Sequence, residues 1–291
     1  MTSKDISEFL TSRRAKVTPE LAGLPVYGRN RRVTGLRREE VALLAGISVE
    51  YYTRLERGSA TGISESVLDG VATALRLDDV ERLHLHNLVR AAQAPHQPAR
   101  HRRPTRTTVR PALQRVLDSM VEAPAYIRNG RSDILGANAL GRALYAPIFD
   151  MGDAVPNVAR FVFLSPAAPD FFIDFDKVEA DSVAILRGQA GRDPYDKQLT
   201  ALVGELSTRS ERFGQLWARH DVTLHRAGTK RLHHPVVGDL TLGYEAFDLP
   251  ADPGQRINVY TAEPGSPDAE SLALLASWAS EPYPTTVAEK D

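Results

Sequence analysis

The sequence predicts two domains of different fold class, an all-helical N-terminal domain followed by an α+β domain with an antiparallel sheet. The length of 291 residues suits two domains of ordinary size. Apolar residues recur at helical spacing as far as about residue 95, whereas alternating strand patterns dominate after residue 222. A segment rich in proline and arginine separates the two regions.

The N-terminal domain, expected over residues 1–95, should contain five short helices. Turn-forming glycines interrupt its apolar runs, so no helix can be long. Side chains suited to helix N-caps stand at Ser48, Ser64 and Asp78. Glu81 follows Asp78 at the spacing of a capping box. These local signals predict where three of the helices begin.

The stretch from Leu36 to Gly58 has the pattern of two helices joined by a sharp turn. Gly46 can adopt the positive φ that such a turn requires, and Ser48 would cap the second helix. Ala42 is small enough for a second helix to cross close by. The residues expected to face inward are Val41, Leu44, Ala45, Tyr52 and Leu55.

This stretch resembles the XRE family of helix-turn-helix repressors, and the resemblance covers most of residues 5–92. It implies a lambda-repressor-like fold that binds double-stranded DNA, with the second helix in the major groove. The alternative is a helical protein-interaction module of the same fold. The residues expected to contact DNA are Arg29, Arg31, Arg32, Arg37, Arg38, Ser48, Val49, Glu50, Tyr51, Thr53 and Arg54.

Individual roles follow from the match to the family pattern. Residues 48–51 should face base edges, and Arg38 takes the position that anchors the preceding helix to phosphate. Arg37 stands where the family has a capping threonine, so that side-chain cap should be missing. Glu50 would repel phosphate unless it accepts from a cytosine amino group or pairs with an arginine. The basic loop 29–32 is either a backbone clamp or a solvated connection.

The basic, proline-rich segment 96–111 is expected to be a linker. The second domain is expected over residues 112–280 and is followed by a tail at 281–291. Its predicted order is a helix, a hairpin, several helices, a strand meander and a last helix. The expected helices are 112–122, 138–146, 157–164, 177–190, 196–219 and 268–279. The expected strands are 125–127, 134–135, 222–226, 230–234, 240–247 and 256–262.

This half resembles the ligand-binding domain of MmyB-like regulators, on segments that include 157–164 (NVARFVFL) and 213–267. The resemblance implies a PAS-like fold, with helices over one face of an antiparallel sheet and a pocket between them. It also implies a fatty-acid-like or other small apolar ligand, held without a covalent bond. The candidate ligand residues are Arg160, Phe161, Phe172, Arg187, Trp217, Arg219, His220, Lys230 and Tyr244.

Each ligand candidate also has a simpler structural interpretation. The phenylalanines can form core, and the basic side chains can form salt bridges with the abundant acids. Asn138 follows a strand and is expected to cap the next helix.

Charge and composition narrow the function classes. Residues 1–110 carry 19 Lys/Arg and 12 Asp/Glu, whereas residues 111–291 carry 17 and 25, so the basic excess lies with the helical half. Cysteine is absent, which excludes disulfides and thiolate metal sites. The adjacent His233 and His234 would face opposite sides of a strand, so no metal ligand set is expected. No catalytic motif is present, and an enzyme is not expected.

The expected protein is a DNA-binding transcription regulator, in particular a repressor, controlled by a small apolar ligand in its second domain. It should be a cytoplasmic homodimer without membrane association that reads a near-palindromic operator. In the alternative, the second domain is a ligand-free module for dimerisation or protein interaction.

Overall fold

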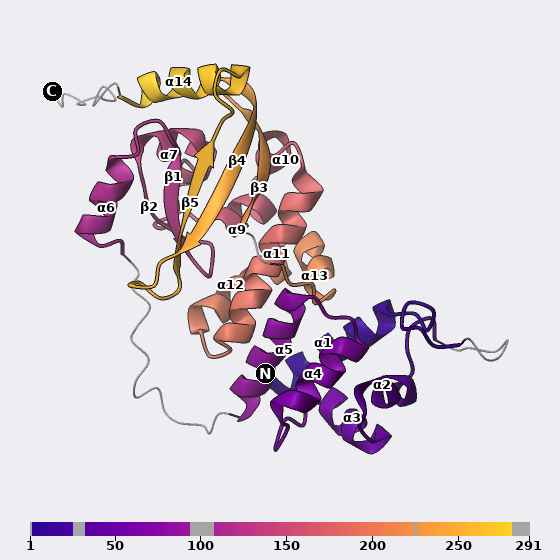
Figure 1. The fold of residues 1–291 in the computed structure, drawn as a ribbon. Helices are drawn as coiled ribbons and strands as arrows, with labels where there is room; N and C mark the ends of the chain where they lie inside the picture. The colour runs from indigo at the N-terminus through magenta and orange to yellow at the C-terminus, as the bar shows by residue number, and fades with distance from the viewer. Residues whose placement is uncertain (1, 26–32, 94–107, 224–225, 281–291) are drawn as a thin grey trace. The chain divides into compact units, whose positions relative to one another are not determined.

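The computed structural model describes residues 2–25, 33–93, 108–223 and 226–280 (Figure 1). Contacts divide the chain into two compact units that do not follow the chain order. The first unit combines Met1–Arg102 with Val183–Leu224, and the second combines Arg103–Ser182 with His225–Asp291. Residues 183–224, which lie within the stretch 112–280 that the sequence assigns to the second domain, group by their contacts with the N-terminal helices.

Five helices form the N-terminal part of the first unit, as the sequence predicts. They are α1 (Thr2–Lys16), α2 (Arg38–Ala45), α3 (Val49–Glu56), α4 (Glu65–Ala74) and α5 (Asp79–Gln93). Their shared core is apolar, with Phe9, Tyr52 and Leu85 fully buried. This core holds α2 and α3 in the helix–turn–helix arrangement.

The predicted caps and turn are confirmed. Gly46 ends α2 with φ of 68°, and the Ser48 hydroxyl accepts from the Tyr51 N–H at 3.1 Å. The Ser64 hydroxyl caps α4 in the same way. At the start of α5, the Asp78 N–H donates to Glu81 and the Glu81 N–H donates back to Asp78.

The inward direction predicted for Leu44 is wrong. Leu44 is 37% exposed, and the neighbouring Leu43 is 73% exposed. With only eight residues, α2 buries a narrow stripe, which Val41 and Ala42 fill. Leu43 and Leu44, which follow directly, lie outside this stripe and are exposed.

Three segments from the second half of the chain complete the first unit. They are the C-terminal part of α11 (Phe175–Arg192), α12 (Lys197–Arg209) and α13 (Glu211–Trp217). The single helix predicted over 196–219 is interrupted at Ser210, whose hydroxyl caps α13 by accepting from the Phe213 N–H. The unit boundary, between Ser182 and Val183, falls inside α11.

The second unit is built on a five-stranded antiparallel sheet in the order β2-β1-β5-β4-β3. The strands are β1 (Ala125–Asn129), β2 (Ile134–Ala137), β3 (Ala227–His234), β4 (Gly238–Asp248) and β5 (Gln255–Thr261). This confirms the predicted fold class. Asn138 caps the helix that follows β2, as expected, by accepting from the Gly141 N–H at 2.7 Å.

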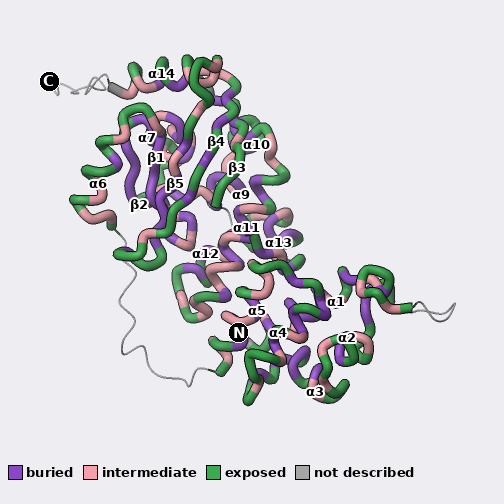
Figure 2. Tube along the Cα trace, in the orientation of Figure 1, coloured by how far each residue is buried: buried purple, intermediate pink, exposed green. Residues whose placement is uncertain are grey.

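Helices cover both faces of part of this sheet. Strands β1 and β5 are buried along most of their length, whereas β4 alternates between buried and exposed residues (Figure 2). One face packs on a small cluster with α6 (Pro111–Asp118), which includes Leu117, Ile127 and Ile257. The other face meets the main core. The remaining helices are α7 (Ala139–Leu144), α8 (Ala146–Phe149), α9 (Val158–Leu164), α10 (Ala168–Phe171) and α14 (Pro267–Ser280).

The strand predicted over residues 222–226 is not present in its described residues. Residues 221–223 have no regular structure, and β3 begins at Ala227. Val222 is only 6% exposed and belongs to the core of the first unit. Its apolar character therefore reflects helix packing rather than the alternation of a strand.

Candidate nucleic-acid interface and ligand site

The outer side of α3 carries the residues predicted to read DNA. Val49, Glu50 and Arg54 are exposed, whereas Tyr52 and Leu55 face the core. The Arg54 guanidinium lies over the Tyr51 ring, 5.3 Å from its centroid. Ser48, Val49, Glu50, Tyr51, Thr53 and Arg54 therefore share one accessible surface at the start and outer side of this helix.

Glu50 has no ion-pair partner among the residues that the structure describes. It is exposed in the first turn of α3, where its charge is favourable to the helix dipole. Arg29, Arg31 and Arg32, the predicted backbone clamp, lie outside the described residues. Of the two roles expected for Glu50, pairing with a described arginine does not occur.

Arg38, the predicted phosphate anchor, also holds the reading helix in place. Its Nε donates to the carboxylate of Glu56, the last residue of α3, which is 1% exposed. The Arg14 Nε donates to the other carboxylate oxygen at 2.6 Å. The Tyr52 hydroxyl adds a bond of 3.3 Å, and burial beside Glu56 raises the pKa of this phenol. A buried carboxylate thus joins α1, α2 and α3, while Arg38 stays 47% exposed toward solvent.

Arg37 lacks a capping side-chain hydrogen bond, as predicted, because a guanidinium has no acceptor atom. A side chain of the first turn of α2 partly takes over the role of the missing cap. The Glu40 carboxylate accepts from the Arg37 backbone N–H at 2.7 Å. The Arg37 side chain pairs at the surface with Glu39, which leaves it accessible.

The predicted ligand residues are divided between the two units. Phe161, Phe172, Lys230 and Tyr244 belong to the second unit, whereas Arg187, Trp217, Arg219 and His220 belong to the first. Phe161 and Phe172 are fully buried in ring contacts with each other and with Phe171, which agrees with their core interpretation.

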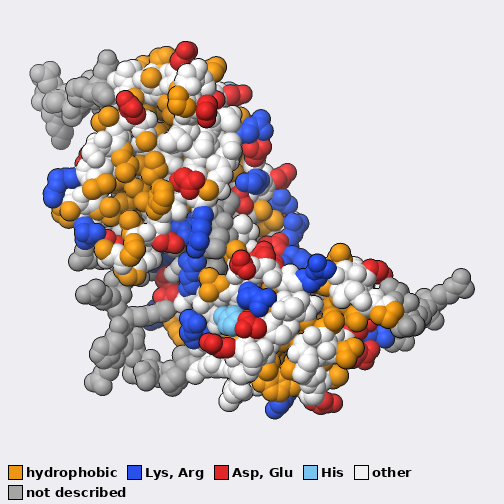
Figure 3. Space-filling model, viewed as in Figure 1, with side chains coloured by type: hydrophobic (Ala, Val, Ile, Leu, Met, Phe, Trp, Pro, Cys, Tyr) orange, Lys and Arg blue, Asp and Glu red, His pale blue; other side chains and the backbone are white. Residues whose placement is uncertain are grey.

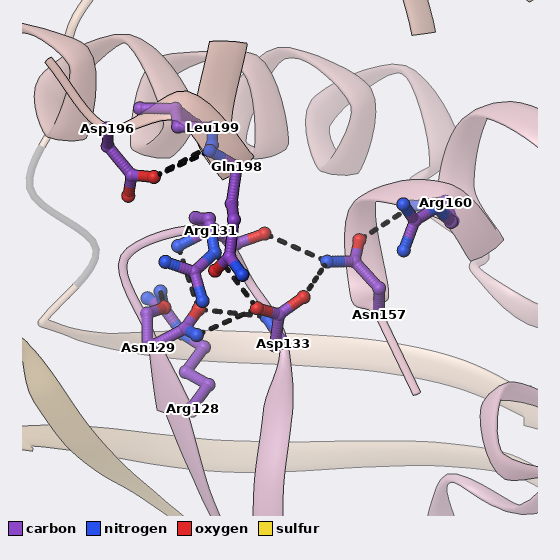
Figure 4. Close-up of polar contacts among 9 residues, drawn as sticks. All are labelled: Arg128, Asn129, Arg131, Asp133, Asn157, Arg160, Asp196, Gln198 and Leu199. Atoms are coloured by element: carbon purple, nitrogen blue, oxygen red, sulfur yellow. Dashed lines mark hydrogen bonds and ion pairs between the residues drawn. The ribbon is translucent and has the colours of Figure 1, made fainter. Parts of the chain in front are cut away.

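Arg160 lies in the first turn of α9, at the end of a polar network shown in Figure 4. Asp133 accepts from Asn129 at 2.8 Å and from Asn157 at 2.7 Å. The Asn157 side chain in turn accepts from the Arg160 backbone N–H at 2.9 Å. This network fixes the start of α9, and hence Phe161, against the β1–β2 hairpin.

The interior of the second unit contains a cluster of tyrosine hydroxyls. The Tyr145 hydroxyl donates to Tyr260 at 2.8 Å, and the hydroxyls of Tyr126 and Tyr260 lie 3.3 Å apart. Burial raises the pKa of Tyr145 and of Tyr260 well above the usual phenol value, so both stay protonated. Polar groups therefore occupy part of an otherwise apolar core.

Basic and amide donors share the sheet face that carries these tyrosines. Tyr126 pairs with Asn258, and Arg128 with Arg256, so the four side chains point to the same side. Arg128 is 7% exposed and forms no ion pair with any described residue. The Asn258 Nδ2 is buried without a hydrogen-bond partner.

Lys230, one of the predicted ligand residues, extends this group of donors. Its ammonium lies 5.7 Å from the Phe172 ring and 5.9 Å from the Tyr244 ring. Burial is the main cause that lowers its pKa to about 8; the Asp181 carboxylate opposes this shift, and Lys177 and Arg128 add to it. Sequence reasoning missed Arg128 and Asn258. The strand sequence alone carries no signal for either, because their burial depends on segments distant in the chain.

In the first unit, the remaining candidates form a separate junction. Arg187 is 5% exposed, lies 4.0 Å from the centroid of the Trp217 ring and bonds the His220 Nδ1 at 2.9 Å. His220 has a left-handed φ of 55°, and its carbonyl accepts from Arg13 of α1. Arg219 is exposed beside this junction. Arg187 and His220 thus connect α11, the end of α13 and α1 within the first unit.

Together, a helix-turn-helix with an accessible reading face and a sheet domain with a polar interior define the class of a DNA-binding transcription regulator. Residues 109–275 match the family model described as the MmyB-like transcription regulator ligand binding domain, and residues 6–85 match one described as a helix-turn-helix domain. The chain belongs to the MmyB-like transcription regulators. A comparison with curated proteins found no match.

Two further properties of the described residues concern membranes and metals. None of their helices combines the length and apolar character that crossing a membrane requires. No group of three or more metal-ligating side chains occurs among them. On the face drawn in Figure 3, basic and acidic side chains are intermingled over the first unit, so the basic excess does not form one continuous patch there.

Proposed function

We propose that this regulator binds an anionic, fatty-acid-like ligand inside its second unit and that the ligand alters its affinity for DNA. The observation that carries the proposal is the set of hydrogen-bond donors on one buried sheet face: Arg128, Asn258 and Lys230. A buried cation is costly unless an anion compensates it. A carboxylate supplies acceptor oxygens for the unsatisfied Asn258 Nδ2 and for the Arg128 guanidinium, whose hydrogen bond within the described residues is a long one of 3.4 Å to the Asn129 carbonyl.

The surroundings suit the rest of such a ligand. Phe161, Phe171 and Phe172 lie next to one another in the same core and offer apolar contacts for an alkyl chain. Phe172 also lies under Lys230, which places the apolar and cationic parts side by side.

Palmitate binding to the full chain tests this function by isothermal titration calorimetry. We expect palmitate to bind and 1-hexadecanol, which has the same chain but no charge, to bind at least about tenfold more weakly. Arg128→Met should weaken palmitate binding by a similar factor, whereas the matched control Arg115→Met, at an exposed position on α6, should not. Equal binding of acid and alcohol would exclude an anionic head group. No binding of either would favour the ligand-free module.

We also propose that the active form is a homodimer on a near-palindromic operator. One short reading helix covers a single half-site, and two copies related by a twofold axis read two half-sites. Sedimentation equilibrium should give a homodimer for the protein alone. With a duplex selected from a random pool, it should give two chains per duplex. A single chain that binds one half-site tightly would contradict the dimer.

The proposed direction of control is repression. A reading helix placed on an operator that overlaps a promoter blocks polymerase by occupancy, and no further surface is needed. Transcription in vitro from a promoter that carries the selected site should fall as the protein is added. An increase in transcript would show activation instead.

A further inference from the structure

We infer that helix α11 passes the state of the second unit's interior to the DNA-reading helix, through the side chains of Arg187, Arg13 and Arg14. This inference rests on the proposed function for the identity of the ligand, but not for the path itself. The path consists of one helix shared by both units and a series of side-chain contacts within the first.

The N-terminal part of α11 belongs to the ligand-binding interior. Val178 is 5% exposed and lies in the main core of the second unit. Asp181, one turn further on, forms an ion pair of 3.4 Å with Lys177 and acts electrostatically on both Lys230 and Tyr244. A ligand that pairs with the Lys230 ammonium therefore changes the forces on this part of α11.

The C-terminal part of the same helix belongs to the DNA-binding unit. Arg187 bonds His220 and the Trp217 carbonyl, which ties α11 to the end of α13. Gly191 packs so closely on α5 that an added Cβ would lie 2.6 Å from atoms of the buried His84 ring. Because a helix is stiff over three turns, a displacement at Asp181 also moves Arg187 and Gly191.

Two adjacent arginines of α1 connect this junction to the reading helix. Arg13 donates to the His220 carbonyl and, at 3.1 Å, to the Asp221 carboxylate. It also forms an ion pair of 3.2 Å with Glu81 of α5. Arg14, the next residue, holds the buried Glu56 at the end of α3. A movement of the corner at His220 thus acts on the helix that orients α3.

Hydrogen–deuterium exchange tests the path with DNA as the only ligand, because coupling between two sites is reciprocal. The probe is the duplex selected from a random pool, added to the full chain. We expect DNA to change exchange by about twofold or more in residues 175–182, the part of α11 that belongs to the second unit and carries no predicted DNA contact. Unchanged exchange in this segment of the DNA-bound wild type would overturn the inference.

Two pairs of variants locate the coupling. Arg187→Met removes the bonds to His220 and Trp217, and its control is Arg209→Met, at an exposed arginine of α12. Gly191→Ala wedges α11 away from His84, and its control is Gly188→Ala, whose added Cβ meets nothing within 4 Å. Arg187→Met and Gly191→Ala should still bind DNA but lose the DNA-dependent change in residues 175–182, while both controls keep it.

The outcomes separate this inference from the proposed ligand. If palmitate does not bind while DNA still changes exchange in α11, the ligand proposal fails and the path stands. If palmitate binds and the change persists in both Arg187→Met and Gly191→Ala, the path fails and the ligand stands. Should Arg187→Met not fold, Gly191→Ala and the wild type give the same decision.

Discussion

Lys230 is a residue whose charge depends on pH within an accessible range. Burial lowers its pKa from 10.5 to about 8, with Asp181 opposing this shift and Arg128 adding to it. In the folded chain the ammonium is lost as pH rises through about 8, whereas the unfolded chain keeps its proton up to about 10.5. The folded state therefore binds fewer protons between these values, and its free energy of unfolding should rise with pH across this window.

Ligand affinity should change in the opposite direction. Between about pH 7 and about pH 9.5, palmitate affinity should fall as Lys230 loses its charge, because the carboxylate stays ionised throughout. Lys230→Met should bind palmitate weakly at both values and show little dependence on pH. Calorimetric titrations at the two pH values measure this difference, and an identical decline in the variant would assign the dependence to another group.

Glu56 is expected to be the most sensitive charged residue of the reading domain. Glu56→Gln leaves Arg14 and Arg38 without their shared carboxylate and should lower the free energy of unfolding by about 3 kcal/mol. Glu39→Gln removes an exposed pair with Arg37 and should cost less than about 1 kcal/mol. Urea unfolding of the two variants compares them, and equal effects would mean that the buried carboxylate adds no special stability.

At the scale of single residues, the sequence predicts correctly those features that depend on residues nearby in the chain. The caps at Ser48 and Asn138 depend on backbone groups three residues away, so the sequence carries the whole signal. The burial of Arg128, the partners of Glu56 and the outward turn of Leu44 depend on distant segments. No pattern within a short window distinguishes a buried arginine in a strand from an exposed one.

Among the elements, the packing of α1 on the end of α3 has little tolerance for added atoms. Gly58 has φ of +87°, and a Cβ there would lie 2.1 Å from the Ser3 carbonyl oxygen. Gly58→Ala should therefore destabilise the chain by more than about 2 kcal/mol, from both steric overlap and left-handed strain. Gly62→Ala, with φ of +71° and no atom nearby, should cost only the strain of about 1 kcal/mol. Thermal unfolding compares the pair, and equal losses would refute the close approach.

The prediction of elements succeeded for strong periodicity and failed at short apolar runs. The helices and strands of the second unit lie near their expected positions, because alternation and caps mark them. The segment before β3 was misread because Val222 is apolar without being part of a sheet. The short helices α8 and α10 were missed, since four residues are too few to show a period.

For the whole molecule, the first unit should depend on residues far along the chain. A fragment of residues 1–102 lacks Val222, which belongs to its core, and the partners of Arg13 at His220 and Asp221. We expect this fragment to be less stable than the same unit in the full chain by about 2 kcal/mol or more. Circular dichroism melts measure the difference, and addition of residues 183–224 through a flexible linker should restore stability. An unchanged melting temperature would show that the N-terminal helices are self-sufficient.

The two-part organisation was predictable, but the assignment of segments to units was not. Composition separates a helical, basic half from a mixed, acidic half, and the proline-rich stretch lies between them. Nothing in the pattern of α11 indicates that its two ends serve different cores, because both ends bury apolar residues at the same period. Only the contacts of Arg187 and Val178 distinguish them.

Because the first unit is discontinuous in sequence, its DNA-binding helices cannot reach their final packing until late in synthesis of the chain. The helix-turn-helix leaves the ribosome first, but residues 183–224 follow it only after a further ~6 to ~24 s at ordinary rates of synthesis. Until then Arg13 lacks His220 and Asp221, and α1 is held by fewer partners. An interrupted translation product therefore lacks part of the unit that contains the helix-turn-helix. We expect full DNA affinity only after residues 183–224, and with them most of the second half of the chain, have been synthesised.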